Sequence, residues 1–289
     1  MILITGASGN VGREVLKQIA PTGVRVRAGF QSVGKVNVPS EVEVAVIDYN
    51  QVETLREALQ GVDRVFLVGP PTAELTELER NAIDVIKQSA VQQVVKLSAM
   101  GGRESIFPRQ HAESEDYIRS CGVPYTFLRP NGFMQNMINY NAPTITRQNA
   151  FYGTEGDGRI SQIDIRDVAA VALKVLRDEN AAYLGQAYTL TGPEALTNSE
   201  LAAIMSEVLG RKIQYINLPP QQFRGALLSA GVPEWSADAL LDLERLYREG
   251  PAATVTDDVK QILGRKPIHF AQFVRDYQSA FELREQAAS

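Results

Sequence analysis

The chain has 289 residues, of which 44% are hydrophobic and 22% charged, and its formal net charge is -5. This composition is typical of a globular protein with a sizeable core, and the length predicts one large domain or a domain with a smaller companion. The acidic charge argues against nucleic acid as a partner, and no apolar run reaches the ~20 residues of a membrane-spanning helix. One cysteine excludes an internal disulfide, and two histidines offer little for a metal centre. Because the N-terminus also lacks the pattern of a signal peptide, we expect a cytoplasmic protein with no metal and no membrane partner.

In the first half of the chain, short apolar runs alternate with stretches of helical periodicity. We predict strands over residues 2–4, 24–30, 42–47, 65–68, 94–97 and 125–128. The stretches between them predict helices over residues 11–20, 51–60, 75–90 and 110–120. Such alternation is typical of parallel strands joined by crossover helices, because each strand must be covered on both faces. The predicted fold class is therefore α/β.

Beyond Pro130 this rhythm loosens and helical periodicity predominates. Helices are predicted over residues 168–177, 199–209, 221–228, 237–248 and 270–281, and short strands over residues 187–190 and 213–216. Residues 153–158 are rich in glycine and are the most loop-like stretch. We therefore divide the chain into a first domain, residues 1–130, and a smaller, mostly helical C-terminal lobe, residues 131–289. A strand or two of that lobe is expected to return to the main sheet.

The strongest local signal is a loop with glycine at every third position, which follows the first predicted strand and opens the first predicted helix. Glycine at the first position permits a tight turn, and glycine at the second lets a pyrophosphate approach backbone N–H groups. Glycine at the third allows the helix to pack closely on the sheet. The helix N-terminus then provides aligned N–H dipoles for an anion. The alternative is an ordinary strand–helix turn, but the position at the start of a βαβ series favours a dinucleotide site. The candidate residues are Gly6, Ser8, Gly9, Asn10, Val11 and Gly12.

The choice between NAD and NADP depends on the residues after the second predicted strand. An acidic residue there would hold a ribose 2′-hydroxyl and favour NAD, whereas an arginine would favour NADP. This chain has Gly-Phe-Gln-Ser at residues 29–32, with neither, so NADP(H) is weakly favoured over NAD(H). Gln31 and Lys35 are candidate cofactor contacts, and Lys35 and Arg27 are candidate partners for a 2′-phosphate. The alternative for these cations is ordinary solvation.

Segments spread along the whole chain carry a family resemblance. They are ITGASGNVG from residue 4, ALQGVDRVFLV from residue 58, SCGVPYTFLRPNGFMQN from residue 120, GDGRISQIDIRDVA from residue 156 and YTLTGPEALTNSELA from residue 188. Together they resemble the NmrA-like family of atypical short-chain dehydrogenase/reductases. That family includes quinone and triphenylmethane-dye reductases, and also NAD(P)-binding regulators that perform no chemistry. The resemblance implies a Rossmann-type doubly wound parallel sheet, a small C-terminal lobe and a cleft between them.

The resemblance also implies roles for individual residues. Gly6, Gly9, Asn10 and Val11 would face the pyrophosphate, Asp48 the adenine, Gly69 and Pro70 the ribose, and Ser98 the nicotinamide, with Pro130 to Phe133 following along the cleft. From the residues themselves, the alternative for Asp48 is an N-cap before the helix near Gln51, and both roles are compatible. The family's usual arginine after the second strand aligns here with Phe30, so 2′-phosphate recognition lacks its usual partner.

Dehydrogenases of the wider superfamily use Tyr-x-x-x-Lys on the helix before the sixth strand, where the tyrosine protonates the substrate carbonyl oxygen and the lysine lowers the tyrosine pKa. In this chain those positions fall on Phe107 and His111. Phenylalanine has no proton to give, so alcohol–ketone chemistry by that mechanism is not expected. Quinone-reductase members resemble this chain in carrying histidine at the lysine position, and a histidine could steer or protonate a quinone oxygen. The catalytic candidates are therefore His111 and Ser98. The alternative for His111 is a surface residue near a helix start, and the alternative for Ser98 is a hydroxyl that satisfies local backbone groups.

Two functions from different classes follow from these residues. The first is an NAD(P)H-dependent reductase of a quinone-like or other conjugated small molecule, with Phe133, Met134 and Met137 either lining the acceptor pocket or packed in a core. The second is a non-catalytic dinucleotide-binding protein that reports cofactor redox state to a partner, which the missing tyrosine favours. The expected ligand is thus a small-molecule acceptor, and a homodimer or a regulatory protein partner remains open.

Overall fold

The computed structural model describes residues 1–32, 38–179 and 181–282, and it divides into two compact units. The first unit comprises Met1–Pro130, Ile165–Leu190 and Asp258–Arg265. The second comprises Asn131–Asp164, Thr191–Asp257 and Lys266–Ser289. The first segment of this unit thus ends at Pro130, where the regular alternation of predicted strands and helices stops. The unit also includes two later segments of the chain.

A parallel sheet forms the centre of the first unit. Its strands are β1 (Ile2–Ile4), β2 (Val26–Phe30), β3 (Glu43–Val46), β4 (Arg64–Leu67), β5 (Gln93–Leu97), β6 (Tyr125–Pro130) and β8 (Gln186–Leu190). Their order is β3-β2-β1-β4-β5-β6-β8, and every pairing is parallel. This is the doubly wound Rossmann order, which reverses direction between β1 and β4, and ligands of such sheets bind at the carboxyl ends of strands beside that reversal.

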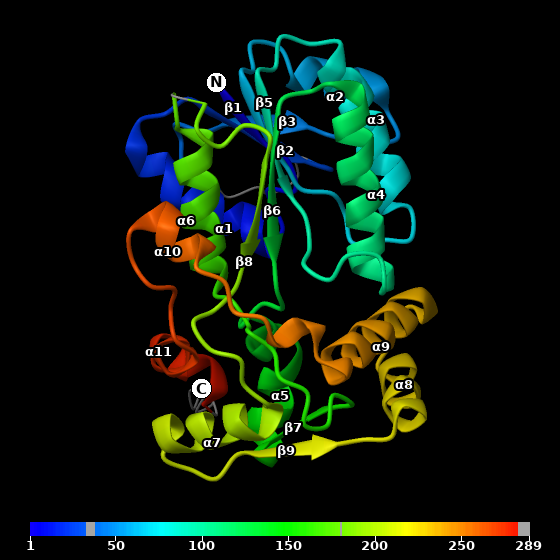
Figure 1. The fold of residues 1–289 in the computed structure, drawn as a ribbon, viewed down its shortest axis with the longest axis vertical. Coiled ribbons are helices and arrows are strands. Elements are labelled where there is room, and N and C mark those ends of the chain that lie inside the picture. Colours follow the sequence, from blue (N-terminus) through cyan, green and yellow to red (C-terminus); the bar gives the residue numbers. More distant parts are fainter. Residues whose placement is uncertain (33–37, 180, 283–289) are drawn as a thin grey trace, which may run out of the picture. The chain divides into compact units, whose positions relative to one another are not determined.

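Helices cover both faces of this sheet (Figure 1). One face carries α2 (Val52–Ala58), α3 (Leu75–Lys87) and α4 (Ile106–Cys121), and the other carries α1 (Asn10–Ile19) and α6 (Ile165–Leu176). The short helix α10 (Asp258–Leu263) packs against α6 and β8. Neither α10 nor the return of α6 was expected from the sequence. Of the two strands predicted in the C-terminal lobe, β8 rejoins the main sheet and β9 (Gln214–Asn217) does not.

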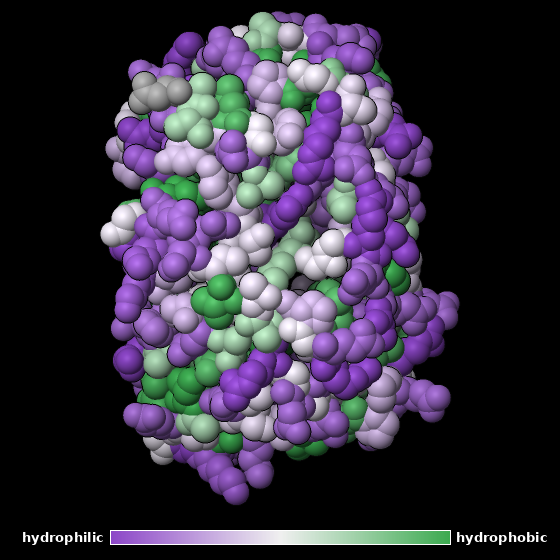
Figure 2. All heavy atoms as spheres, viewed as in Figure 1, coloured by the Kyte–Doolittle hydropathy of each residue, from purple (hydrophilic) through white to green (hydrophobic). Residues whose placement is uncertain are grey.

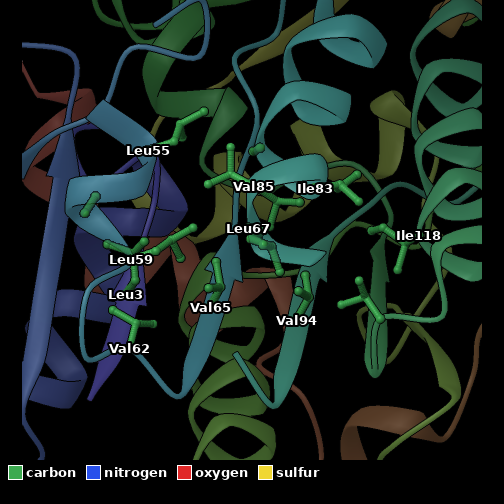
Figure 3. Close-up of a cluster of buried hydrophobic side chains, with 14 of the residues drawn as sticks. Leu3, Leu55, Leu59, Val62, Val65, Leu67, Ile83, Val85, Val94 and Ile118 are labelled. Carbon is green, nitrogen blue, oxygen red and sulfur yellow. The ribbon is translucent and has the colours of Figure 1, made fainter. Parts of the chain in front are cut away.

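The core on the α2–α4 side consists of aliphatic side chains from the strands and from the buried faces of the helices (Figure 3). Leu3, Val65 and Val94 from the sheet share this cluster with Ile83 of α3 and Ile118 of α4, and Leu3 lies beside Leu59, which follows α2. Burial of each such side chain contributes about 1.5–3 kcal/mol of transfer free energy. This packing fixes α3 and α4, which carry functional candidates, against the strands that carry the others.

Helix α4 begins earlier than the sequence predicted. It starts at Ile106 after Ser105, whereas the periodicity predicted a start at residue 110. The added residues include Pro108, and a proline in the first helical turn is harmless because N–H groups there have no intrahelical acceptor. The earlier start places both Phe107 and His111 on the same helix.

The second unit has a small parallel sheet of β7 (Ala150–Gly153) and β9 (Gln214–Asn217). Its helices are α5 (Ala142–Gln148), α7 (Asn198–Leu209), α8 (Pro220–Ser229), α9 (Glu234–Glu249) and α11 (Phe270–Asp276). Helix α7 begins with a capping box of Thr197 and Glu200. The sequence predicted neither α5 nor β7, and it extended α11 through residues that form a separate 3-10 turn, Gln278–Phe281.

On the face drawn in Figure 2, hydrophilic residues predominate and hydrophobic residues form only small groups among them. Among the helices of the described ranges, none combines the length and the apolarity that a bilayer crossing requires.

Candidate cofactor and active site

The glycine loop occupies the reversal point of the sheet, directly after β1. Gly6 has φ +58°, a left-handed conformation that glycine adopts without strain. The Gly9 N–H donates to the Gly6 carbonyl oxygen at 2.9 Å, which closes the turn. Gly9 then serves as the N-cap of α1. The structure thus places the predicted tight turn at the first glycine.

The second and third glycines have different roles. Gly9 is exposed, with φ -75° and ψ 168°, and an added Cβ would meet only the Gly6 oxygen, at 3.2 Å. A Cβ on Gly12 would lie 2.3 Å from that same oxygen and 3.0 Å from the Ala7 Cα. The third glycine therefore allows α1 to pack against the loop itself, a closer neighbour than the sheet that the motif predicted.

The residue types at this loop fit a pyrophosphate. Ser8, Gly9 and Asn10 are exposed, and Asn10, Val11 and Gly12 begin α1. The N–H groups of the first helical turn precede the first intrahelical bond, here from the Arg13 N–H to the Gly9 carbonyl, so they remain available to an anion. No Cβ occupies the space in front of Gly9, which is where a phosphate would approach the backbone.

The loop is fastened to the neighbouring strand by Thr5 and Tyr49. The Thr5 hydroxyl accepts from the Val68 N–H at 2.7 Å and donates to the Val68 carbonyl at 3.1 Å. The Tyr49 hydroxyl also donates to the Val68 carbonyl, at 2.8 Å, and burial raises the pKa of Tyr49. These bonds hold the ends of β1 and β4 together beside the glycine loop.

The residues after β2 give a mixed outcome for the 2′-phosphate hypothesis. Gln31 is exposed at the carboxyl end of β2, the edge that holds the glycine loop. Lys35 lies outside the described residues. Arg27 donates to Glu43 and to the carbonyls of Ala58 and Gln60, so its guanidinium has a structural role. The hypothesis that Arg27 holds a phosphate is therefore not supported by the structure.

Asp48 stabilises the turn that leads into α2. Its Oδ1 accepts from the Asn50 N–H at 2.9 Å, and its Oδ2 accepts from the Gln51 side chain at 2.8 Å. The N-cap residue of α2 is Gln51, so the proposed N-cap role of Asp48 is wrong by three positions. A carboxylate has about four acceptor sites, so Asp48 keeps capacity for the amino group of an adenine.

His111 projects from α4 onto a buried ion pair. Lys96 of β5 and Glu79 of α3 are both fully buried, and the Lys96 Nζ lies 2.7 and 2.6 Å from the two Glu79 carboxylate oxygens. The His111 Nδ1 lies 3.1 Å from the same Nζ. Burial, and next the charge of Lys96, hold the pKa of His111 well below its usual range. His111 is therefore a neutral, half-buried imidazole, and the alternative of a surface histidine is wrong.

Ser98 belongs to a second polar group, one residue beyond β5. Its buried hydroxyl donates to Glu115 Oε1 at 2.6 Å, and Arg129 and Arg119 also donate to that carboxylate. Burial opposes ionisation of Glu115, but the hydrogen bonds from Arg129 and Ser98 outweigh it and lower the carboxyl pKa. Because the Ser98 hydroxyl already donates its hydrogen bond to Glu115, this geometry favours a positioning role for Ser98. The alternative of a hydroxyl satisfying backbone is also wrong, since its partner is a side chain.

Three further candidates border these groups. Gly69 lies two residues after β4, and a Cβ there would lie 2.7 Å from Glu79 Oε1, so the Glu79 side chain packs directly against the backbone of this glycine. Pro70 accepts from the Thr72 N–H at 2.9 Å. Pro130 ends β6 and accepts from the Met100 N–H at 3.0 Å. These residues shape the turns at the carboxyl edge of the sheet.

In the second unit, the candidates for an acceptor pocket are divided. Met134 and Met137 are 1% and 5% exposed and belong to its hydrophobic core, which is the packing alternative predicted for them. Phe133 is half-buried. A search of the described residues for three or more His, Cys, Asp or Glu side chains that could hold a metal ion finds no such group.

Sequence reasoning missed Lys96 and Glu79. Lys96 lies within a strand that was treated as apolar, and Glu79 lies within an amphipathic helix. A lysine inside a buried strand is itself a signal, because lysine is almost never fully buried without a partner. That signal predicts a buried acidic residue nearby, but the sequence alone does not say which one.

Comparison with known proteins shows one family and several reductases that are similar to this chain along nearly its whole length. The model of the NmrA-like family matches residues 1–272. An NAD(P)H azoreductase of Xenophilus azovorans is 32% identical over 97% of this chain and 99% of its own length. The (4-alkanoyl-5-oxo-2,5-dihydrofuran-3-yl)methyl phosphate reductase of Streptomyces griseus is 37% identical, again over 97% and 99%. Among solved structures, an NADPH-dependent quinone oxidoreductase of Escherichia coli complexed with NADPH has a TM-score of 0.83 at 27% identity, covering 96% of this chain and 99% of that one.

Proposed function

The chain belongs to the NmrA-like family, and we propose that it is an NAD(P)H-dependent reductase of quinone-like or other conjugated small molecules. The observation that carries the proposal is the open glycine loop at the reversal point of the sheet, in a chain that aligns end to end with reductases. The azo, dihydrofuranone and quinone compounds in the names of those relatives share conjugation. That shared feature supports the acceptor class and leaves the individual acceptor open.

The cofactor of the proposal is NADP(H), which supplies a hydride when bound. The first turn of α1 and the exposed loop residues Ser8 and Gly9 would hold its pyrophosphate, and Asp48 its adenine. Since no acidic residue follows β2 through Ser32, nothing there would repel a 2′-phosphate, and Gln31 is exposed for a contact. The relatives named for NAD(P)H and NADPH support the same choice.

The acceptor would be oriented by His111. A conjugated acceptor spreads the charge that hydride addition creates, so it needs a hydrogen-bond donor more than a strong acid. The neutral imidazole of His111 can provide such a donor, and Phe107 cannot. Ser98, together with Glu115 and Arg129, would fix the turn after β5 along which the acceptor lies. These roles for His111 and Ser98 are proposals.

The competing function is a redox sensor that binds NAD(P) without turnover. The missing tyrosine at Phe107 favours it, but two relatives that are 32% and 37% identical over 99% of their own length are named as reductases, which favours the enzyme. A cytoplasmic location, and a homodimer or protein partner, stay predictions from the sequence.

The deciding experiment is NAD(P)H oxidation by the purified protein with a panel of acceptors. The panel should hold a small quinone, an azo dye, a triphenylmethane dye and, as a control, a simple aliphatic ketone. We expect turnover with at least one conjugated acceptor and none with the ketone. Tight cofactor binding without any turnover would overturn the reductase and favour the sensor.

A further inference from the structure

The hydrogen-bond partners of the Lys96 ammonium constrain which nitrogen of His111 carries the proton. An ammonium group has three N–H donors and no lone pair, so every polar partner of Nζ must accept. Two of the donors face the Glu79 carboxylate oxygens, at 2.7 and 2.6 Å. The third is shared by the His111 Nδ1 at 3.1 Å and the Leu97 carbonyl at 3.3 Å. Within this contact, the His111 Nδ1 must present its lone pair.

We propose that Lys96 and Glu79 are positioning residues that hold His111 as the neutral tautomer with its proton on Nε2. An imidazole whose Nδ1 accepts a hydrogen bond carries its one proton on the other nitrogen. His111 then presents an N–H donor to an acceptor's developing negative charge, without giving up a proton. The catalytic consequence rests on the proposed reductase function, whereas the tautomer itself does not.

The surrounding residues support this arrangement. Glu79 packs against the bare backbone of Gly69, where a Cβ would lie 2.7 Å from Glu79 Oε1, so its carboxylate has little room to turn away from Lys96. Gln110, the residue before His111, donates to the carbonyls of Thr72 at 3.1 Å and Ala73 at 2.8 Å. These bonds fasten the first part of α4 to the turn after β4. The position of Lys96 is thus fixed by Glu79, and the backbone next to His111 is fixed by Gln110.

A buried ion pair that merely stabilised the fold would be a poor choice. Replacing such a pair by apolar residues of similar volume is often neutral or stabilising, because the desolvation of two charges offsets their attraction. Orientation of His111 gives the pair a second role. That role can be separated from folding by replacing both charges at once, in the variant Glu79→Met/Lys96→Met, since neither charge is then left unpaired.

The first test is nitrogen NMR of the imidazole rings, which distinguishes the two neutral tautomers from the imidazolium. The chain has only two histidines, so His111→Gln assigns the signals, and His269 serves as an internal control. We expect wild-type His111 to carry its proton on Nε2 near neutral pH. In Glu79→Met/Lys96→Met the Nδ1-protonated or imidazolium form should appear, with His269 unchanged. A proton on Nδ1 in the wild type, or an unchanged tautomer in the double variant, would overturn the proposal.

The second test is a cycle of reductase measurements. If the pair acts through His111, Glu79→Met/Lys96→Met should lower kcat for a quinone about as much as His111→Ala does, roughly tenfold. Adding the pair replacement to His111→Ala should then cost nothing further, because effects on one group are not additive. A further loss of equal size in the His111→Ala background would overturn a role through His111. If the wild type shows no turnover, the proposed function fails, and the NMR result still decides the tautomer.

Discussion

The same substitution should affect cofactor binding at Gly9 and stability of the fold at Gly12, the two later glycines of the proposed cofactor loop. Valine at position 9 adds atoms to the exposed side of the loop, where its Cβ meets only the Gly6 oxygen, at 3.2 Å. Its backbone angles suit any residue, so the expected loss of stability is that of a poorer N-cap, about 1 kcal/mol. The new side chain fills the space of the pyrophosphate, so the cofactor Kd should rise at least tenfold, about 1.4 kcal/mol.

Valine at position 12 should instead damage the fold. Its Cβ would lie 2.3 Å from the Gly6 oxygen, and backbone atoms on both sides cannot move aside cheaply. Overpacking costs about 1–3 kcal/mol, which corresponds to a melting temperature lower by several degrees at about 2–4 °C per kcal/mol. Thermal unfolding and cofactor titration of both variants test the argument. A folded Gly9→Val that binds cofactor normally would remove the pyrophosphate from this loop, and a Gly12→Val as stable as wild type would refute the packing role.

Four further predictions follow from the proposed site and from the second unit. His111→Ala should lower quinone turnover roughly tenfold, about 1.4 kcal/mol, with cofactor affinity little changed; His269→Gln is the matched control, and equal kinetics would eliminate the proposed role. NADPH should bind at least as tightly as NADH in a direct titration, and a tenfold preference for NADH would contradict this. Burial, and next the charge of Glu155, raise the pKa of Glu244 from 4.5 to about 8, so the folded state favours its protonated form and loses stability as pH rises across that range. Glu244→Gln cannot ionise, so its free energy of unfolding should rise relative to that of wild type as pH rises over the same range in denaturant titrations. A difference between the two proteins that does not change with pH would refute the pKa shift. Finally, Phe107→Tyr/His111→Lys should fail to oxidise simple alcohols in a cofactor-reduction assay.

The fold was predictable because its signals are local. The β1 bounds agree with the predicted strand, and the other strands of the main sheet differ from prediction by a few residues, since apolar runs between turns define buried strands well. The sequence prediction was less accurate at element ends, as at α4, which begins at Ile106 and not at residue 110. It also failed where tertiary packing defines an element, as for β7, which exists only through its pairing with β9.

The candidate site was predictable only in part, for the same reason. The glycine loop is contiguous, so its spacing and its place after β1 could be recognised directly. The partner of His111 is Lys96 on β5, whose own partner is Glu79 on α3, and no periodicity connects these residues. Likewise, nothing in the sequence near Ser98 indicated that its hydroxyl would donate a hydrogen bond to Glu115.

Because His111 contacts Lys96, we expect that Phe107→Tyr/His111→Lys does not create a working Tyr-x-x-x-Lys pair. A lysine at position 111 would bring a second ammonium toward Lys96 Nζ, which lies 3.1 Å from the present Nδ1. Glu79 provides one negative charge for both, so one buried cation would remain uncompensated, at a cost of about 3–5 kcal/mol. The new lysine would escape this cost by losing its proton, and a neutral lysine cannot lower the pKa of a tyrosine. We therefore expect the variant to be less stable than Phe107→Tyr alone in denaturant titrations, and Glu79→Met added to it should lower the stability further. Equal stability of Phe107→Tyr/His111→Lys and Phe107→Tyr would show that Lys96 does not constrain position 111.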